Sequence, residues 1–170
     1  MKEISFRDDI MPLGDGLYRM ALRLQLSRQE AEDVVQETML RLWQRRLQWA
    51  DMQNIEAFAM TVCRNLSLDI LRRHARRADT SADSLADVPD TAPHASPELL
   101  AESHDRMETV RQLIAQLPEK QRTAMTLRDL EGKSYRDIAE IMQVSEEQVK
   151  VNIFRARQTV KRLFAHIDAA

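Results

Sequence analysis

Two helices joined by a tight turn are predicted between Ser134 and Phe164, and this pattern constrains the fold of the chain more than any other feature. Ser134 and Ser145 each stand where a side-chain oxygen can cap a helix, and Gln148 follows Ser145 at the spacing of a capping box. Gln143 would have to adopt a positive φ in the turn, where Gly is the usual residue. Apolar residues recur at helical spacing, at Ile138, Ala139 and Met142 in the first helix and at Val149, Ile153, Ala156 and Val160 in the second. The sequence therefore predicts a helix-turn-helix whose apolar faces pack together.

The outward face of the second helix is typical of a DNA-reading surface. With the apolar stripe buried, six side chains face solvent: Lys150, Val151, Asn152, Phe154, Arg155 and Arg157. Arg and Lys donate to base edges and phosphates in the major groove, and a good bidentate base contact contributes about 1–3 kcal/mol of discrimination. A helical hairpin with a solvated basic face is the alternative, because amphipathic helix pairs are common. DNA is the leading partner that this pattern predicts.

The composition favours an all-α fold. Of 170 residues, 44% are hydrophobic and 31% are charged, as in a soluble globular protein. Only three Gly and five Pro occur, and no segment shows the period-two alternation of a strand. Cys63 is the single cysteine, which excludes an internal disulfide, fits a reducing compartment and suits a small buried hydrophobe. No signal peptide or membrane span is recognisable, so a cytoplasmic location is expected.

Charge divides the chain into three parts. Residues 41–77 carry eight Arg against three acidic residues, whereas residues 78–104 carry six acidic residues and neither Lys nor Arg. The acidic stretch also contains three Pro, which is typical of a flexible linker. We therefore expect two small helical domains, 1–77 and 106–170, joined by an acidic linker, 78–105. Helices are predicted over residues 6–24, 27–48 and 54–77, and over residues 107–116 and 118–131 before the helix-turn-helix.

Three strings in a fixed order carry a family resemblance. The strings AEDVVQETMLRLWQR (residues 31–45) and FAMTVCRNLSLDILRRHARR (residues 58–77) resemble region 2 of bacterial sigma-70 factors. The string that begins LPEKQRTAMTLRDLEGKSYRDIAEIMQ (residues 117–143) and continues to Leu163 is similar to region 4. Because no domain intervenes, the resemblance is to the extracytoplasmic-function (ECF) subgroup. It implies a transcription initiation factor that binds core RNA polymerase, recognises minus-10 and minus-35 promoter elements and promotes DNA opening.

The resemblance also assigns residues to partners. Asp33, Gln36 and Glu37 would meet the clamp helices of the polymerase β′ subunit, and the β flap would be a further polymerase contact. The loop at residues 49–56, together with Arg64 and Asn65, would accept an unstacked minus-10 base. The phosphates of the opened strand would be held by Arg72, Arg73, Arg76 and Arg77. The six outward residues of the last helix, Lys150 to Arg157, would read the minus-35 element.

Two departures from the family pattern affect promoter reading. Many relatives carry Ser or Thr where Val151 stands and Arg where Asn152 stands. We therefore expect this protein to recognise a different minus-35 sequence or to depend more on DNA shape. Val151 and Phe154 are suited to contact a thymine methyl. The chain also lacks the aromatic cluster of housekeeping factors, with Trp49 and Phe58 as the nearest aromatics. An anti-sigma factor, often membrane-anchored in this subgroup, is a further implied partner.

Other classes of protein explain fewer residues. A helix-turn-helix repressor or activator with an N-terminal helical dimerisation domain predicts a dimer on palindromic operators, but it leaves the strings at residues 31–45 and 58–77 without a role. An all-helical adaptor is supported only by the net charge of −2. No enzyme, metal or cofactor is expected, because there is no Gly-rich phosphate loop or nucleophile triad and the four His lack metal spacing. These are His74, His94, His104 and His166.

Overall fold

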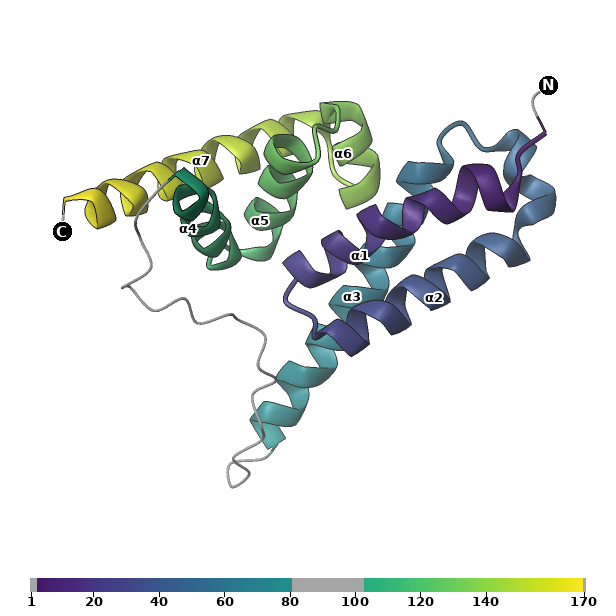
Figure 1. Ribbon diagram of the computed structural model, residues 1–170, viewed down its shortest axis with the longest axis horizontal. Helices are drawn as coiled ribbons and strands as arrows, with labels where there is room; N and C mark the ends of the chain where they lie inside the picture. The colour runs from purple at the N-terminus through teal and green to yellow at the C-terminus, as the bar shows by residue number, and fades with distance from the viewer. Residues whose placement is uncertain (1–2, 81–102, 170) are drawn as a thin grey trace. The chain divides into compact units, whose positions relative to one another are not determined.

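The computed structural model describes residues 3–80 and 103–169, and these form two compact units (Figure 1). Helices account for all the regular structure in the described residues, so the predicted all-α fold is confirmed. Most of the predicted acidic linker lies outside the described residues. The helix before it continues to Thr80, and the helix after it begins at Ser103, so residues at both ends of the predicted linker are helical.

Three long helices make the N-terminal unit: α1 (Gly14–Arg23), α2 (Arg28–Gln44) and α3 (Ile55–Thr80). Each packs against the other two. Two short segments, η1 (Phe6–Ile10) and η2 (Met11–Leu13), precede α1, and η3 (Arg46–Asp51) follows α2. The prediction of one helix over residues 6–24 was therefore too simple, because Pro12 near the start of η2 lacks the N–H that a continuous α-helix needs. The second helix also ends earlier than predicted and turns into the 3₁₀ segment η3.

Polar groups inside the N-terminal unit are satisfied locally. Ser27 and Glu30 form the predicted capping box at the start of α2, with both reciprocal hydrogen bonds present. The buried hydroxyls of Thr38 and Ser67 donate to backbone carbonyls four residues earlier, at 2.7 and 2.8 Å. Cys63 is fully buried among these helices, as predicted, and burial raises the pKa of its thiol to about 12. The thiol therefore stays protonated and inert at neutral pH.

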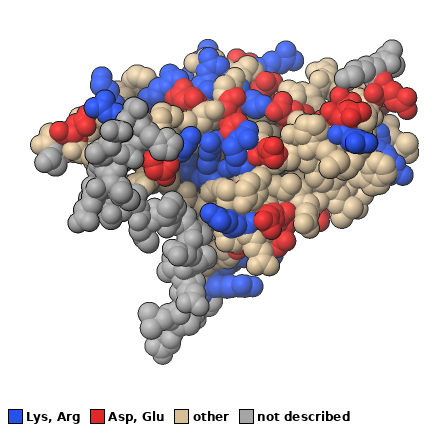
Figure 2. Space-filling model, in the orientation of Figure 1, with Lys and Arg blue, Asp and Glu red and all other residues tan. Residues whose placement is uncertain are grey.

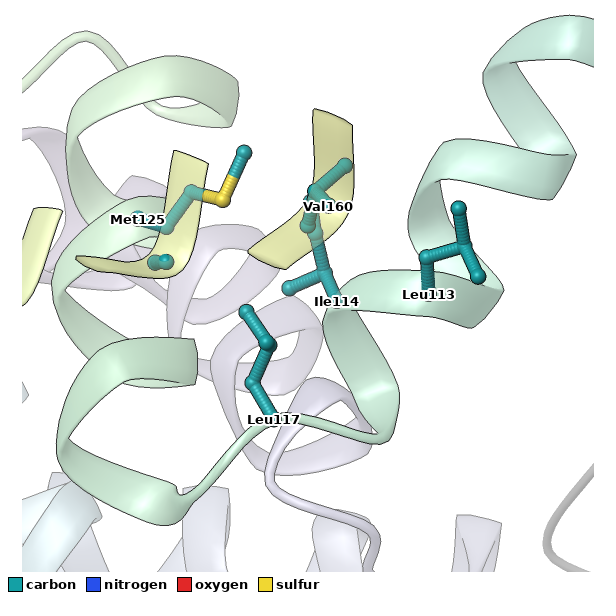
Figure 3. Packing of buried hydrophobic residues seen from close by; sticks show 6 residues of the cluster. Leu113, Ile114, Leu117, Met125 and Val160 are labelled. Atoms are coloured by element: carbon teal, nitrogen blue, oxygen red, sulfur yellow. The ribbon is translucent and has the colours of Figure 1, made fainter. Parts of the chain in front are cut away.

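In the C-terminal unit, α4 (Ser103–Ala115), α5 (Glu119–Met125) and α6 (Tyr135–Met142) all pack against the long α7 (Glu146–Asp168). A π-helical turn, η5 (Thr126–Leu130), connects α5 to the loop before α6. Figure 3 shows side chains from α4, α5 and α7, and from the turn after α4, pointing into one core. The members of this cluster are Leu113, Ile114, Leu117, Met125, Ala156 and Val160.

The helix-turn-helix is confirmed by its local geometry. The Oγ of Ser134 accepts from the N–H of Asp137, and the Oγ of Ser145 accepts from the N–H of Gln148, so both predicted caps are present. All seven predicted apolar positions of α6 and α7 are buried. Gln143 ends α6 at φ 55° and ψ 46°, in the left-handed region where a side chain is strained.

We predict that Gln143→Gly stabilises the C-terminal unit by about 0.5–1 kcal/mol, because it relieves the left-handed strain and loses only part of this gain to unfolded-state entropy. Thermal unfolding of the full chain measures the change. Gly132, at φ 68° with open space around its Cα, is the matched control, since Gly132→Ala should destabilise the same unit. An unchanged midpoint for Gln143→Gly contradicts the prediction.

Candidate nucleic-acid and protein interfaces

The N-terminal half of α7 presents the outward face that the sequence predicted. Val151 and Phe154 are 46% and 62% exposed, although both are large and apolar. Lys150, Arg155 and Arg157 are also exposed, and Figure 2 shows Lys and Arg side chains along the edge where α7 lies in Figure 1. Asn152 is half-buried, and its side-chain amide donates to the carbonyl of Gln148 at 2.9 Å. The face therefore combines an apolar pair with flanking cations, which suits contact with a major groove.

Lys150 makes a cation–π contact with an aromatic ring of α6. Its Nζ lies 5.6 Å from the ring centroid of Tyr135, the first residue of α6. The guanidinium of Arg128 lies 4.4 Å from the same centroid and donates to the carbonyl of Lys133 at 2.9 Å. Two cations thus share one ring beside a helix N-terminus, where backbone N–H groups also favour an anion. This arrangement suits a DNA phosphate better than a base edge.

Arg157 has a partner that the sequence analysis did not predict. Its Nε donates to Asp129 Oδ2 at 2.9 Å, and its Nη2 donates to Asp129 Oδ1 at 2.5 Å. This bidentate pair fixes α7 to η5, and hydrogen bonding to Asp129 raises the pKa of the Arg157 guanidinium. No local pattern could have indicated the pair, because the two residues are 28 positions apart.

The candidate polymerase-binding residues lie along α2. Asp33 and Gln36 are exposed, whereas Glu37 is half-exposed and accepts from Arg41 Nε at 2.9 Å. Three exposed apolar residues continue from this polar group toward and into η3: Leu40, Trp43 and Leu47, with Leu47 89% exposed. Helical spacing places Trp43 with the apolar face of this helix, so its exposure, like that of Leu40 and Leu47, was not predicted from the sequence. Together the two groups make a mixed polar and apolar surface of the kind that binds proteins.

The candidate minus-10 residues do not all share one surface of α3. Asn65, Arg72, Arg73 and Arg76 are exposed, and Arg72 pairs with Asp69 at 3.2 Å within the helix. Arg64 is only 7% exposed and lies inside the N-terminal unit next to Cys63. A surface contact with DNA through Arg64 is therefore not supported, because the buried face of α3 includes this position.

The two aromatics nearest to the candidate minus-10 surface are both engaged within the protein. Trp49 is 5% exposed, and its indole N–H donates to the carbonyl of Leu42 at 3.0 Å. The ring of Phe58 is half-buried under the guanidinium of Arg45, at 5.3 Å. Neither ring is presented for stacking on a base.

The described residues contain no group of His, Cys, Asp and Glu that could hold a metal ion. Among the same residues, no helix is long and apolar enough to cross a membrane. His74 instead pairs with Glu30, with 2.7 Å between Nε2 and Oε1, and so links α3 to the start of α2.

Two protein families match this chain. Residues 10–77 match "Sigma-70 region 2", and residues 107–160 match "Sigma-70, region 4". The first match covers α1, α2 and most of α3, and the second covers α5, α6 and most of α4 and α7.

Two curated relatives are similar to this chain over most of their length. The chain is 30% identical to the ECF RNA polymerase sigma factor SigM of Bacillus subtilis, over 87% of this chain and 88% of that one. It is also 30% identical to the ECF RNA polymerase sigma factor EcfG of Rhodopseudomonas palustris, over 98% and 88%. Among solved structures, the sigma factor RpoE of Bartonella quintana, crystallised with the anti-sigma factor NepR, is 25% identical with a TM-score of 0.71, covering 94% of this chain and 96% of that one.

We predict a favourable coupling of about 0.5–1 kcal/mol between Asp129 and Arg157, near the upper end for partly exposed ion pairs because the geometry is bidentate. A double-mutant cycle of Asp129→Ala and Arg157→Ala, followed by urea unfolding of the full chain, measures it. Arg155→Ala is the control, since Arg155 is a neighbouring exposed Arg outside this pair. Strictly additive effects of the two substitutions would contradict the prediction.

Proposed function

The chain belongs to the sigma-70 family of RNA polymerase sigma factors, within its ECF group, and from this we propose that it binds core polymerase and directs it to two-part promoters. It is a transcription initiation factor. The observation that carries the proposal is the exposed face of α7. Val151, Phe154 and Arg155 lie on this face, and the buried apolar stripe lies on the other side of the helix. In this proposal residues 1–77 form the region 2 domain, residues 78–105 the linker and residues 106–170 the region 4 domain.

The proposed polymerase surface is the outer face of α2. Asp33, Gln36 and Glu37 supply polar contacts to the β′ clamp helices, and the exposed Leu40 and Trp43 supply apolar area beside them. An apolar centre with a polar surround is typical of specific protein interfaces. The C-terminal unit makes a second contact, with the β flap.

The proposed minus-10 surface consists of the loop at residues 49–56 and the exposed residues of α3. Asn65 can donate to and accept from a base edge. Arg72, Arg73 and Arg76 bind phosphates of the opened strand, and these contacts do not depend on the base sequence. Arg64 is left out of this surface because it is buried.

The proposed minus-35 surface divides the six predicted residues by role. Val151 and Phe154 contact thymine methyls, and Arg155 donates to a base or a phosphate. Lys150 binds a phosphate together with Arg128, because both are held at the Tyr135 ring. Asn152 is tied to Gln148, and Arg157 positions α7 through Asp129.

Control by an anti-sigma factor is also proposed. The solved sigma factor from Bartonella quintana is described in complex with such a partner, and its fold covers nearly all of this chain. We propose that the same class of partner covers the polymerase-binding and DNA-binding faces here. The free factor would then act in the cytoplasm, where polymerase and chromosome are found.

We predict that the chain co-elutes with sigma-free bacterial core polymerase and that the complex initiates from a random promoter library at a two-part motif. The double variant Asp33→Ala, Gln36→Ala should lose at least about tenfold in core affinity, since it removes two polar contacts of the proposed surface at once. Arg28→Ala, an exposed residue on α2 outside that surface, is the control. No co-elution, with binding of the free chain to palindromic DNA, would favour a repressor instead.

We predict that Lys150 and Phe154 differ in the kind of DNA binding that they support. Lys150→Ala should weaken binding of the holoenzyme to all minus-35 sequences alike and reduce the slope of log affinity against log salt by about one. Phe154→Ala should leave that slope unchanged and relax selectivity at one or two positions. The proposed roles are wrong if Lys150→Ala alters base preference.

A further inference from the structure

Phe6, near the start of the chain, meets Trp43 and Trp49 in the N-terminal unit. The ring of Phe6 stacks on Trp49, with centroids 6.3 Å apart and planes inclined by 14°. Its other contact is edge-on to Trp43, at 5.3 Å and 80°. Trp43 and Trp49 also touch each other edge to face at 6.3 Å. We call these three residues the aromatic corner.

The aromatic corner joins the start of the chain to the connection between α2 and α3. Phe6 belongs to residues 4–13, which we call the N-terminal strap. Trp49 belongs to η3 and is anchored by burial and by its hydrogen bond to Leu42. η3 ends at Asp51, and α3 begins at Ile55 directly after Asn54, whose side chain accepts from the N–H of Ala57 at 2.9 Å. Residues 50–53 are therefore fixed at two ends, and Phe6 packs on the first of these anchors.

The N-terminal strap is itself well fixed. The Oγ of Ser5 accepts from the N–H of Asp8 at 3.3 Å, and the N–H of Ser5 donates to the carboxylate of Asp9 at 2.8 Å. Ile10 is fully buried in the core. These contacts give the strap a defined shape before any partner binds, so Phe6 is presented to Trp49 at low entropic cost.

A hollow of about 310 Å³ lies between the N-terminal strap and the segment at residues 52–56, which is part of the loop at residues 49–56. Ile4, Asp9 and Leu13 line it from the strap, and Met52, Gln53 and Ile55 line it from the other side. Because one wall of the hollow comes from each segment, its shape depends on how the strap sits against the loop. Its lining combines apolar side chains with the amides of Gln53 and Asn54 and the carboxylates of Asp9 and Glu56. A nucleobase needs a face for stacking and an edge for hydrogen bonds, and these groups offer both.

We propose that the N-terminal strap holds the loop at residues 49–56 in the shape that engages the minus-10 element, and that Phe6 is the positioning residue. This inference rests on the proposed function, because it assumes that the loop meets promoter DNA. Phe6 acts through Trp49 and contacts no DNA itself. Trp43 belongs both to the aromatic corner and to the proposed polymerase surface, so core binding and promoter opening are measured separately.

The test compares Phe6→Ala, Phe6→Tyr and wild type as full-length holoenzymes on the strongest promoter recovered from the library. Permanganate reactivity of unpaired thymines measures opening, and single-base changes in the minus-10 element measure selectivity. With core polymerase at a saturating concentration, we expect Phe6→Ala to reduce opening about tenfold and to flatten minus-10 selectivity, as a misplaced binding element does. Phe6→Tyr keeps the ring and should restore both readouts.

Intrinsic fluorescence monitors the aromatic corner directly, because Trp43 and Trp49 are the two tryptophans of the chain. Phe6→Ala should shift the emission to the red as Trp49 gains water, whereas Met11→Ala, at an exposed residue of the same strap, should not. Should Phe6→Ala unfold the N-terminal unit, Phe6→Leu removes the ring with less loss of volume and is tested in the same way.

The outcomes separate the two proposals. If the library yields no promoter with the wild-type holoenzyme, the proposed function fails. If promoters are recovered, and folded Phe6→Ala or Phe6→Leu opens them with wild-type efficiency and selectivity, the strap inference alone is overturned.

Discussion

A single buried stripe on a long helix is the constraint on which the C-terminal unit depends. Val149, Ile153, Ala156 and Val160 occupy one side of α7, and α4, α5 and α6 all pack against this helix. Since the stripe takes only part of the helix circumference, the opposite side contributes little to folding. Residues there can change to suit a partner, which explains how large apolar side chains such as Phe154 are tolerated in the open. In the N-terminal unit, α3 is likewise buried on one side and exposed on the other: Ala59 and Cys63 are buried, and Asn65 is exposed.

Local signals in the sequence were enough to predict the fold class and the helix-turn-helix. The caps at Ser27, Ser134 and Ser145 depend on hydrogen bonds within a few residues, so their spacing determines them. The end of α2 was harder to predict. Its continuation through residue 48 was plausible by propensity, yet the helix stops at Gln44, and Trp49 turns back to bury its ring and bond to Leu42. Tertiary burial of one large side chain outweighed a weak local preference.

The exposure of candidate site residues could be predicted where it follows from the helical spacing of apolar residues. It could not be predicted where it depends on contacts between residues far apart in the sequence. Exposure of Val151, Phe154 and Arg155 follows from the apolar stripe beside them. The family resemblance assigned Arg64 to the DNA surface, but it lies on the side of α3 that faces the core, where Arg is rarely found. The Asp129–Arg157 pair and the stacking of Phe6 on Trp49 join segments that sequence spacing alone cannot relate.

The chemistry of the α7 face bears on how two small units could select a promoter. Asn152 donates one side-chain N–H to Gln148 and keeps its second N–H and its Oδ1, whereas Val151 and Phe154 offer no hydrogen bond. Few hydrogen-bonding groups on this face can therefore read base edges. Apolar contact with thymine methyls discriminates less than bidentate hydrogen bonding does. A minus-35 element read in this way binds weakly by itself, and the phosphate contacts of Lys150 and Arg128 add affinity without sequence preference. Because both units belong to one chain, binding of one unit to its promoter element raises the effective concentration of the other unit at its own element. Two weak interactions can then give stable binding together. Selectivity then rests more heavily on the minus-10 element, and the fixed shape of the loop at residues 49–56 gains importance accordingly.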